Sequence, residues 1–352
     1  MTGTYLYGIV ERADPANLNV RGIDGTSRVR VAAYGDLGTV VSAHQGATDF
    51  GALPREALLR SLLAYQQVIE RVAQRQMVLP VKFGTVLAAA DEARDLIAQN
   101  RTVLRDAFES VRGTVEIEVA VTWELSRILH EIGAEPEVAS AREALERHGR
   151  ASPDERVALG RLVKSCLDRR RTAIRGRALD DLGPLAARVA SHALLDDRFA
   201  MNEAFQIPRE RLPEFDRRVR QLDALFEGQI LFRVVGPLPP YTFCTVDVTR
   251  VTALQLDEAR GVLGLSGAAL DTHVVRGAYR NLAAQTQRQL RAASSAMPRF
   301  GQLKAASELL LAGCRADPPA RQLAADRRDH WLARIQSTGL PDISPASFGG
   351  GV

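Results

Sequence analysis

The sequence has few cysteines, aromatic residues and lysines, and each scarcity narrows the class of protein. Aromatic residues are only 5% of the 352 residues, which disfavours the stacking platforms that bind single-stranded nucleic acid. The three cysteines (Cys166, Cys244 and Cys314) are odd in number and far apart, so we expect buried thiols in a reducing compartment. No window reaches the ~18 consecutive apolar residues of a membrane span, and residues 1–10 lack a secretory pattern. We therefore expect a soluble cytoplasmic protein with no membrane partner.

Arginine supplies nearly all of the positive charge. Lysine occurs only at Lys82, Lys164 and Lys304, and the formal net charge is +4. The densest cluster, Arg169-Arg170-Arg171 with Arg175 and Arg177, lies in a predicted helix and at its C-terminal end. Guanidinium groups recognise phosphate, but no aromatic residues interleave with these arginines, so a solvated helix face is the favoured interpretation. No nucleic-acid partner is predicted.

Motifs for catalysis, cofactors or metals are missing. There is no phosphate-binding Gly-x-x-x-x-Gly-Lys-Ser/Thr, no Gly-x-Ser-x-Gly and no Cys-x-x-Cys. His130-Glu131 begins like a zinc-protease pair, but Ala134 occupies the place of the second histidine. Glu116 and Glu118 are two carboxylates on one strand face, a pattern that a half-exposed strand also gives without function. We predict no catalytic residue, no cofactor and no metal site, and therefore no enzymatic activity.

Residues 1–113 predict an N-terminal α+β domain. Residues 5–11 are β-rich, and the runs 29–33 and 39–43 flank a turn, which predicts a hairpin. Pro54 opens an amphipathic helix, and the extended run 77–86 contains Pro80, which indicates a bulge or an edge position. A second amphipathic helix is predicted over 91–111, with Gly113 as its stop.

Residues 114–249 predict a second α+β domain, of the ferredoxin-like type. Apolar and polar residues alternate over 115–123, which is typical of a strand with one buried face. Helical sequence follows over 137–181 with a new start at Ser152-Pro153, and then two short strands over 187–195 and 200–209, the first of which is equally compatible with helix. A helix over 213–226 and a strand over 229–235 complete the order strand, helix, two strands, helix, strand. Asn202, a polar residue in an apolar strand, is expected to satisfy a backbone group.

The remaining sequence predicts a small all-helical C-terminal region over 250–338 and a disordered tail over 339–352. Short apolar helical patterns recur in the first part, and the tail is rich in Pro, Gly and Ser.

The segment Gly236-Pro237-Leu238-Pro239-Pro240-Tyr241-Thr242-Phe243 is the most informative stretch. Its prolines remove backbone donors and fix φ angles, so neither a helix nor a central strand continues through it. We expect a stiff extended segment after a buried strand, displaying Tyr241 and Phe243. Pro239, Pro240, Tyr241 and Phe243 are therefore the candidate protein interface.

Four motifs in order resemble the gas vesicle protein L/F family (GvpL/GvpF), over roughly residues 4–245. They are Tyr5-Leu6-Tyr7-Gly8-Ile9-Val10, the run Val78–Val86, Asn202-Glu203-Ala204-Phe205, and the proline-rich segment 236–243. Leu238 departs from the family, which often has tryptophan there. The resemblance implies an accessory protein of gas vesicle formation, built from two α+β units. Its implied partners are the small, very hydrophobic shell protein (gas vesicle protein A) and other accessory proteins, at the gas vesicle.

Residues beyond 250 resemble a degenerate J-domain instead. The resembling segments are Leu263-Gly264-Leu265, the run Val275–Ala283 and Phe300–Ala306. Gln287-Arg288-Gln289 stands where that family has His-Pro-Asp, which argues against stimulation of a heat-shock ATPase. The resemblance leaves two alternatives: a chaperone adaptor that acts through the C-terminal helices, or a simple helical cap.

Overall fold

The computed structural model describes residues 2–11, 18–45, 49–147, 152–226, 228–266, 270–290, 297–317 and 329–336. The chain divides into two compact units. Unit 1 consists of Met1–Arg112 together with Cys244–Ser337, and unit 2 contains Gly113–Phe243. None of the described helices is long and apolar enough to cross a bilayer. The predicted disordered tail, residues 339–352, lies outside the described residues.

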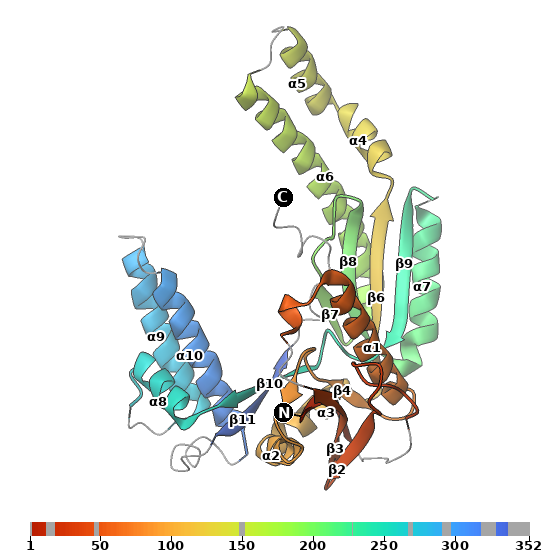
Figure 1. Ribbon diagram of the computed structural model, residues 1–352. Coiled ribbons are helices and arrows are strands. Elements are labelled where there is room, and N and C mark those ends of the chain that lie inside the picture. The colour runs from red at the N-terminus through yellow and green to blue at the C-terminus, as the bar shows by residue number, and fades with distance from the viewer. Residues whose placement is uncertain are drawn as a thin grey trace. The chain divides into compact units, whose positions relative to one another are not determined.

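Unit 1 is built on an antiparallel sheet with strand order β2-β3-β1-β4 and with β5 beside β1 (Figure 1). The strands are β1 (Thr2–Glu11), β2 (Arg30–Tyr34), β3 (Leu37–Gln45), β4 (Val78–Pro80) and β5 (Val86–Leu87). The predicted hairpin is confirmed, because β2 pairs with β3 around Gly35, whose φ is 73°. The predicted position of Pro80 is also confirmed, since β4 ends the strand path.

Helix α1 (Arg55–Ala73) follows the expected pattern and buries Leu62, Tyr65, Val68, Ile69 and Val72. The single helix predicted over 91–111 is instead two helices, α2 (Glu92–Gln99) and α3 (Arg101–Val111). They are interrupted at Asn100, whose φ of −130° is not helical. The Asn100 side chain donates to the carbonyls of Leu96 (2.9 Å) and Trp331 (2.7 Å) and accepts from the Ala333 backbone (2.8 Å). A contact 231 residues away in sequence thus accompanies the break.

The prediction of an all-helical C-terminal region is wrong, because the region ends in a strand. Its elements are β10 (Thr245–Val251), α8 (Ala253–Val262), α9 (Thr272–Leu290), α10 (Met297–Arg315) and β11 (His330–Gln336). β11 pairs antiparallel with β10 over its whole length. Cys244, Val246, Trp331 and Ala333 pack into the same core as the β1 and α3 side chains. These contacts explain why the region belongs to unit 1 and is not a separate domain. Helices α8, α9 and α10 form a second core beside it.

Unit 2 has the predicted ferredoxin-like fold. Its strands are β6 (Thr114–Trp123), β7 (Arg188–Ser191), β8 (Phe199–Pro208) and β9 (Ile230–Leu238). Its helices are α4 (Leu125–Gly133), α5 (Pro136–Arg147), α6 (Pro153–Leu182) and α7 (Leu212–Leu225). The strands are antiparallel in the order β7-β8-β6-β9, so the first strand of the unit is central and the last lies at an edge. Short 3₁₀ turns occur in both units at Phe50–Ala52, Gly183–Leu185 and Arg209–Arg211.

One face of the unit 2 sheet packs against α6 and α7. Alternate β6 residues, from Val115 to Trp123, join Phe205 of β8 and Phe215 of α7 in one core. The Ser152 hydroxyl accepts from the Glu155 backbone and the Glu155 side chain accepts from the Ser152 backbone, which confirms the predicted start of α6. Figure 1 shows α5 and the first half of α6 projecting beyond the end of this sheet. The opposite sheet face carries Glu116 and Glu118.

Candidate protein-binding site

The proline-rich segment does not display its aromatic side chains. Pro239 and Pro240 are buried, and Tyr241 and Phe243 are 3% and 2% exposed. The Arg188 guanidinium of β7 lies 5.1 Å from the centre of the Phe243 ring and donates to the Phe243 carbonyl at 3.4 Å. The predicted interface of these four residues is therefore wrong as an exposed surface. They are structural residues whose burial local sequence did not reveal.

Strand β9, directly before that segment, is exposed where the sequence predicted burial. It pairs with β6 on one side, and no other described strand pairs with it. Leu231 is 65% exposed and Val234 is 41% exposed. They lie opposite Thr122 and Val119 of β6, so they project from different faces of the sheet. An edge strand with unpaired backbone groups and exposed apolar side chains is a ready template for another strand. The apolar run Ile230–Val235 predicts a buried strand, but such a run fits central and edge strands alike.

Glu116 is buried, contrary to the prediction of a half-exposed carboxylate. It is 0% exposed, and its two oxygens accept from the Thr242 backbone N–H (2.8 Å) and from the Thr242 hydroxyl (2.7 Å). Burial raises the pKa of the Glu116 carboxyl to about 7, the bonds from Thr242 lower it in part, and the charge of Glu118 raises it further. His192 also reaches the Thr242 hydroxyl, with its Nε2 at 3.2 Å. These contacts tie β6 to the proline-rich segment.

The arginine cluster of α6 is engaged in ion pairs within unit 2. Arg169 lies 3.0 Å from Glu135 and 2.7 Å from Glu137, and Arg170 lies 2.6 Å from Glu131 and 2.9 Å from Glu135. Arg171, Arg175 and Arg177 pair with Asp197, Glu203 and Asp181, respectively. Most of these pairs join α6 to neighbouring elements, whereas the Arg177 pair lies within α6. The Arg169 and Arg177 side chains are still 61% and 56% exposed, so part of the cluster is the solvated helix face that the sequence predicts.

Two further polar residues make local contacts with the backbone, and for Asn202 this is the role that the sequence indicated. Asn202 donates from its side chain to the Ala193 carbonyl at 3.1 Å, which confirms that it satisfies a backbone group. Asp196 accepts from the Arg198 backbone at 2.8 Å within the turn before β8. Neither residue is left with an unexplained polar group that would indicate a ligand.

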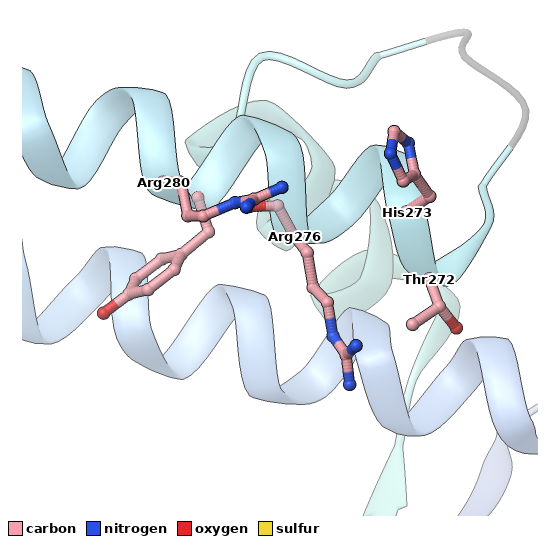
Figure 2. A pocket seen from close by; sticks show the side chains of 5 residues that line it. Thr272, His273, Arg276 and Arg280 are labelled. Atoms are coloured by element: carbon pink, nitrogen blue, oxygen red, sulfur yellow. The ribbon is translucent and has the colours of Figure 1, made fainter.

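A basic hollow lies along α9 in unit 1. Thr272, His273, Arg276, Tyr279 and Arg280 line a space of about 430 Å³. Figure 2 shows His273, Arg276 and Arg280 projecting from the same helix. Among the described residues, Arg276 and Arg280 have no acidic side chain within ion-pair distance. The helical pattern of this region was predicted, but the unpaired basic face was not, because pairing depends on which side chains surround it.

The fold is that of a two-unit α+β protein in which β9 is an edge strand with exposed apolar side chains. The sequence model described as gas vesicle synthesis protein GvpL/GvpF matches residues 3–245, and the chain belongs to that family.

The curated relatives match this chain over nearly their whole length. The chain is 27% identical to gas vesicle protein F of Microcystis aeruginosa over 248 residues, which covers 68% of this chain and 97% of the relative. It is 26% identical to gas vesicle protein F of Nostoc sp. over 250 residues, which covers 70% of this chain and 99% of that protein. The crystal structure of GvpF from Anabaena sp. superposes with a TM-score of 0.59 at 26% identity, covering 69% of this chain and 98% of that one.

These comparisons confirm the family resemblance and the α+β fold class. The family match ends at residue 245, so β11 and helices α8, α9 and α10 lie outside it. The J-domain resemblance of that region stays a prediction.

Proposed function

We propose that this protein is an accessory protein of gas vesicle formation that binds the hydrophobic shell protein and assists vesicle assembly. Family membership supports the process, and the exposed edge of β9 is the observation that carries the binding role. The proposed place of action is the gas vesicle in the cytoplasm, and other accessory proteins are further candidate partners. The role is one of binding, and the proposal assigns no residue to catalysis.

The chemistry of β9 suits a partner with unprotected strands. An added strand forms main-chain hydrogen bonds with an edge, and side chains on alternating faces give specificity. Leu231 and Val234 place one apolar side chain on each face of that edge. A shell subunit with long apolar surfaces aggregates unless another protein covers them. Pairing at β9 would cover one such strand until assembly.

The test is co-expression with the shell protein followed by pull-down. The double variant Leu231→Lys and Val234→Lys places charge on both faces of the edge, and both positions are exposed, so the fold should be retained. The matched control is Leu254→Lys, because Leu254 of α8 is 68% exposed. We expect the β9 variant to lose most of the bound shell protein while the control retains it. Undiminished binding by a folded β9 variant would remove this edge from the proposal.

A second candidate function is that of a chaperone adaptor acting through the C-terminal helices. The basic hollow on α9 favours it, because Arg276 and Arg280 present positive charge one turn apart to an acidic partner. The full chain would be added to a heat-shock ATPase, beside a variant carrying Arg276→Glu and Arg280→Glu. Stimulation or binding that the charge reversal abolishes supports this role. Identical behaviour of both chains argues against it.

A further inference from the structure

Three metal-ligating side chains meet on the sheet face of unit 2 that α6 and α7 leave uncovered. One ligand atom each from Glu116, Glu118 and His192 can be chosen so that all three lie within 4.8 Å of one another. Two-residue spacing on β6 directs both carboxylates to the same face. His192 follows β7, and its backbone N–H donates to the Asn202 carbonyl at 2.8 Å, which holds it beside β8. Three separate strands of the sheet therefore support this group.

The group has two carboxylates, and the described residues supply no basic counter-ion to them. Among the described residues, no lysine or arginine side chain forms an ion pair with Glu116 or Glu118. Arg188, on the neighbouring β7, is instead bonded to Gln206 at 2.6 Å. A buried carboxylate is costly unless it is paired, hydrogen-bonded or bound to a metal. Thr242 supplies hydrogen bonds to Glu116 but no positive charge.

A second group in the same unit provides the contrast. Ligand atoms of Glu135, Glu137 and Cys166 also lie within 4.8 Å of one another. There, however, Arg169 lies 2.7 Å from Glu137, and Arg170 lies 2.9 Å from Glu135. Guanidinium groups already balance those carboxylates, so a cation would have to displace them. Equal donor spacing therefore points to a metal at the first group and not at the second.

We propose that Glu116, Glu118 and His192 bind one divalent transition-metal ion, with Zn²⁺ as the best match. One imidazole nitrogen and two carboxylate oxygens are ordinary zinc ligands, whereas Mg²⁺ and Ca²⁺ prefer oxygen ligands alone. Glu116 is the inner ligand, and the half-buried Glu118 and His192 provide access from solvent. The ion cross-links the centre of the sheet to the segment that follows β7. This site does not depend on the proposed shell-protein binding, which involves β9.

The proposal is tested on the metal-free full chain, by calorimetric titration with Zn²⁺ alone and by thermal unfolding with and without the metal. Glu118→Gln and His192→Gln each remove one partly exposed ligand and leave the buried Glu116 in place. Cys166→Ser is the matched control, because it removes a ligand from the second group. We expect wild type and Cys166→Ser to bind one Zn²⁺ with equal affinity and a raised Tm. Each ligand variant should bind at least tenfold more weakly and lose the Tm increase.

Three outcomes would overturn the proposal. These are no stoichiometric binding by wild type, binding unchanged in both ligand variants, and binding lost in Cys166→Ser. Substitution with Co²⁺ gives an independent readout. A site of one imidazole and two carboxylates gives visible d–d bands without the near-ultraviolet charge-transfer band of a thiolate ligand. A strong thiolate band would assign the bound metal to a cysteine and so refute the site.

Discussion

Replacing Glu116 by glutamine should stabilise unit 2 at pH 8 but not at pH 5, in buffer that contains a chelator. The carboxyl is 0% exposed, and burial raises its pKa from 4.5 to about 7. The folded protein therefore holds this proton more tightly than the unfolded chain does. The stability that this gives is fully present below about pH 4.5 and is lost as the pH rises through 7. Each pKa unit corresponds to about 1.4 kcal/mol, so the difference between 4.5 and about 7 amounts to roughly 3 kcal/mol at pH 8.

Glutamine removes this ionisation but keeps an acceptor for Thr242. The amide oxygen can accept from the Thr242 backbone N–H, and the amide NH₂ group can donate to the Thr242 hydroxyl, as the protonated carboxyl does. The net expectation is a gain of roughly 3 kcal/mol in the free energy of unfolding at pH 8 and little change at pH 5, where the folded carboxyl is protonated. The charge of Glu118 contributes to the raised pKa of the Glu116 carboxyl, and His192 reaches the Thr242 hydroxyl that donates to it.

Urea unfolding followed by tryptophan fluorescence provides the assay. The chain has two tryptophans, and Trp123 belongs to unit 2 whereas Trp331 belongs to unit 1. A Trp331→Phe background therefore restricts the signal to unit 2. The difference between Glu116→Gln and its parent isolates this group from all other titrations. Equal destabilisation at pH 5 and pH 8 would refute the reasoning, because it would mean that Glu116 acts through its hydrogen bonds alone.

Three further substitutions test the packing of each unit. Arg175→Ala leaves the 2%-exposed Glu203 without its ion-pair partner and should cost about 3 kcal/mol in urea unfolding, with much of the loss recovered by adding Glu203→Gln. Asn100→Ala leaves two backbone groups of β11 without their side-chain partner and should lower the free energy of unfolding of unit 1 by about 2 to 4 kcal/mol. Gly8→Ala places a Cβ 2.7 Å from a methyl group of β4, and it should lower the free energy of unfolding by about 1 to 3 kcal/mol in thermal unfolding. Gly277→Ala is the control. Open space surrounds this position, so the substitution should be neutral or stabilising.

Each of these expectations can fail in its own way. If Arg175→Ala has the free energy of unfolding of the wild type, the charge of Glu203 is screened by water and does not need the ion pair. An unchanged free energy of unfolding in Asn100→Ala would mean that the bonds from Asn100 to β11 do not stabilise unit 1. Equal effects of the two glycine substitutions would show that the close approach of β4 to Gly8 does not determine the effect of Gly8→Ala.

Local sequence predicted most elements of unit 2 because its signals lie within each element. Alternation identified β6, and the Ser152-Pro153 start identified α6. The state of Glu116 could not be predicted in this way. Its partner Thr242 is 126 residues further along the chain, and nothing near Glu116 in sequence distinguishes a covered strand face from an open one.

The same limitation explains the errors in unit 1 and at the candidate interface. β11 follows helical sequence and becomes a strand because β10 offers it a partner. The prolines of this segment predict an extended chain that displays Tyr241 and Phe243. Proline fixes backbone geometry, however, and says nothing about which side chains, such as Arg188, cover the segment.

The split composition of unit 1 sets the order in which the protein can fold during synthesis. The described part of unit 2 lies between Gly113 and Phe243, and its core is complete once Ile230 and the rest of β9 have been synthesised. The core of unit 1 still awaits Trp331 and Ala333. Synthesis of the 90 residues between positions 243 and 333 takes roughly 5 to 20 s at ordinary elongation rates. During that interval unit 2 can be folded while the core of unit 1 is incomplete. The apolar core residues of unit 1 are then exposed and prone to aggregation.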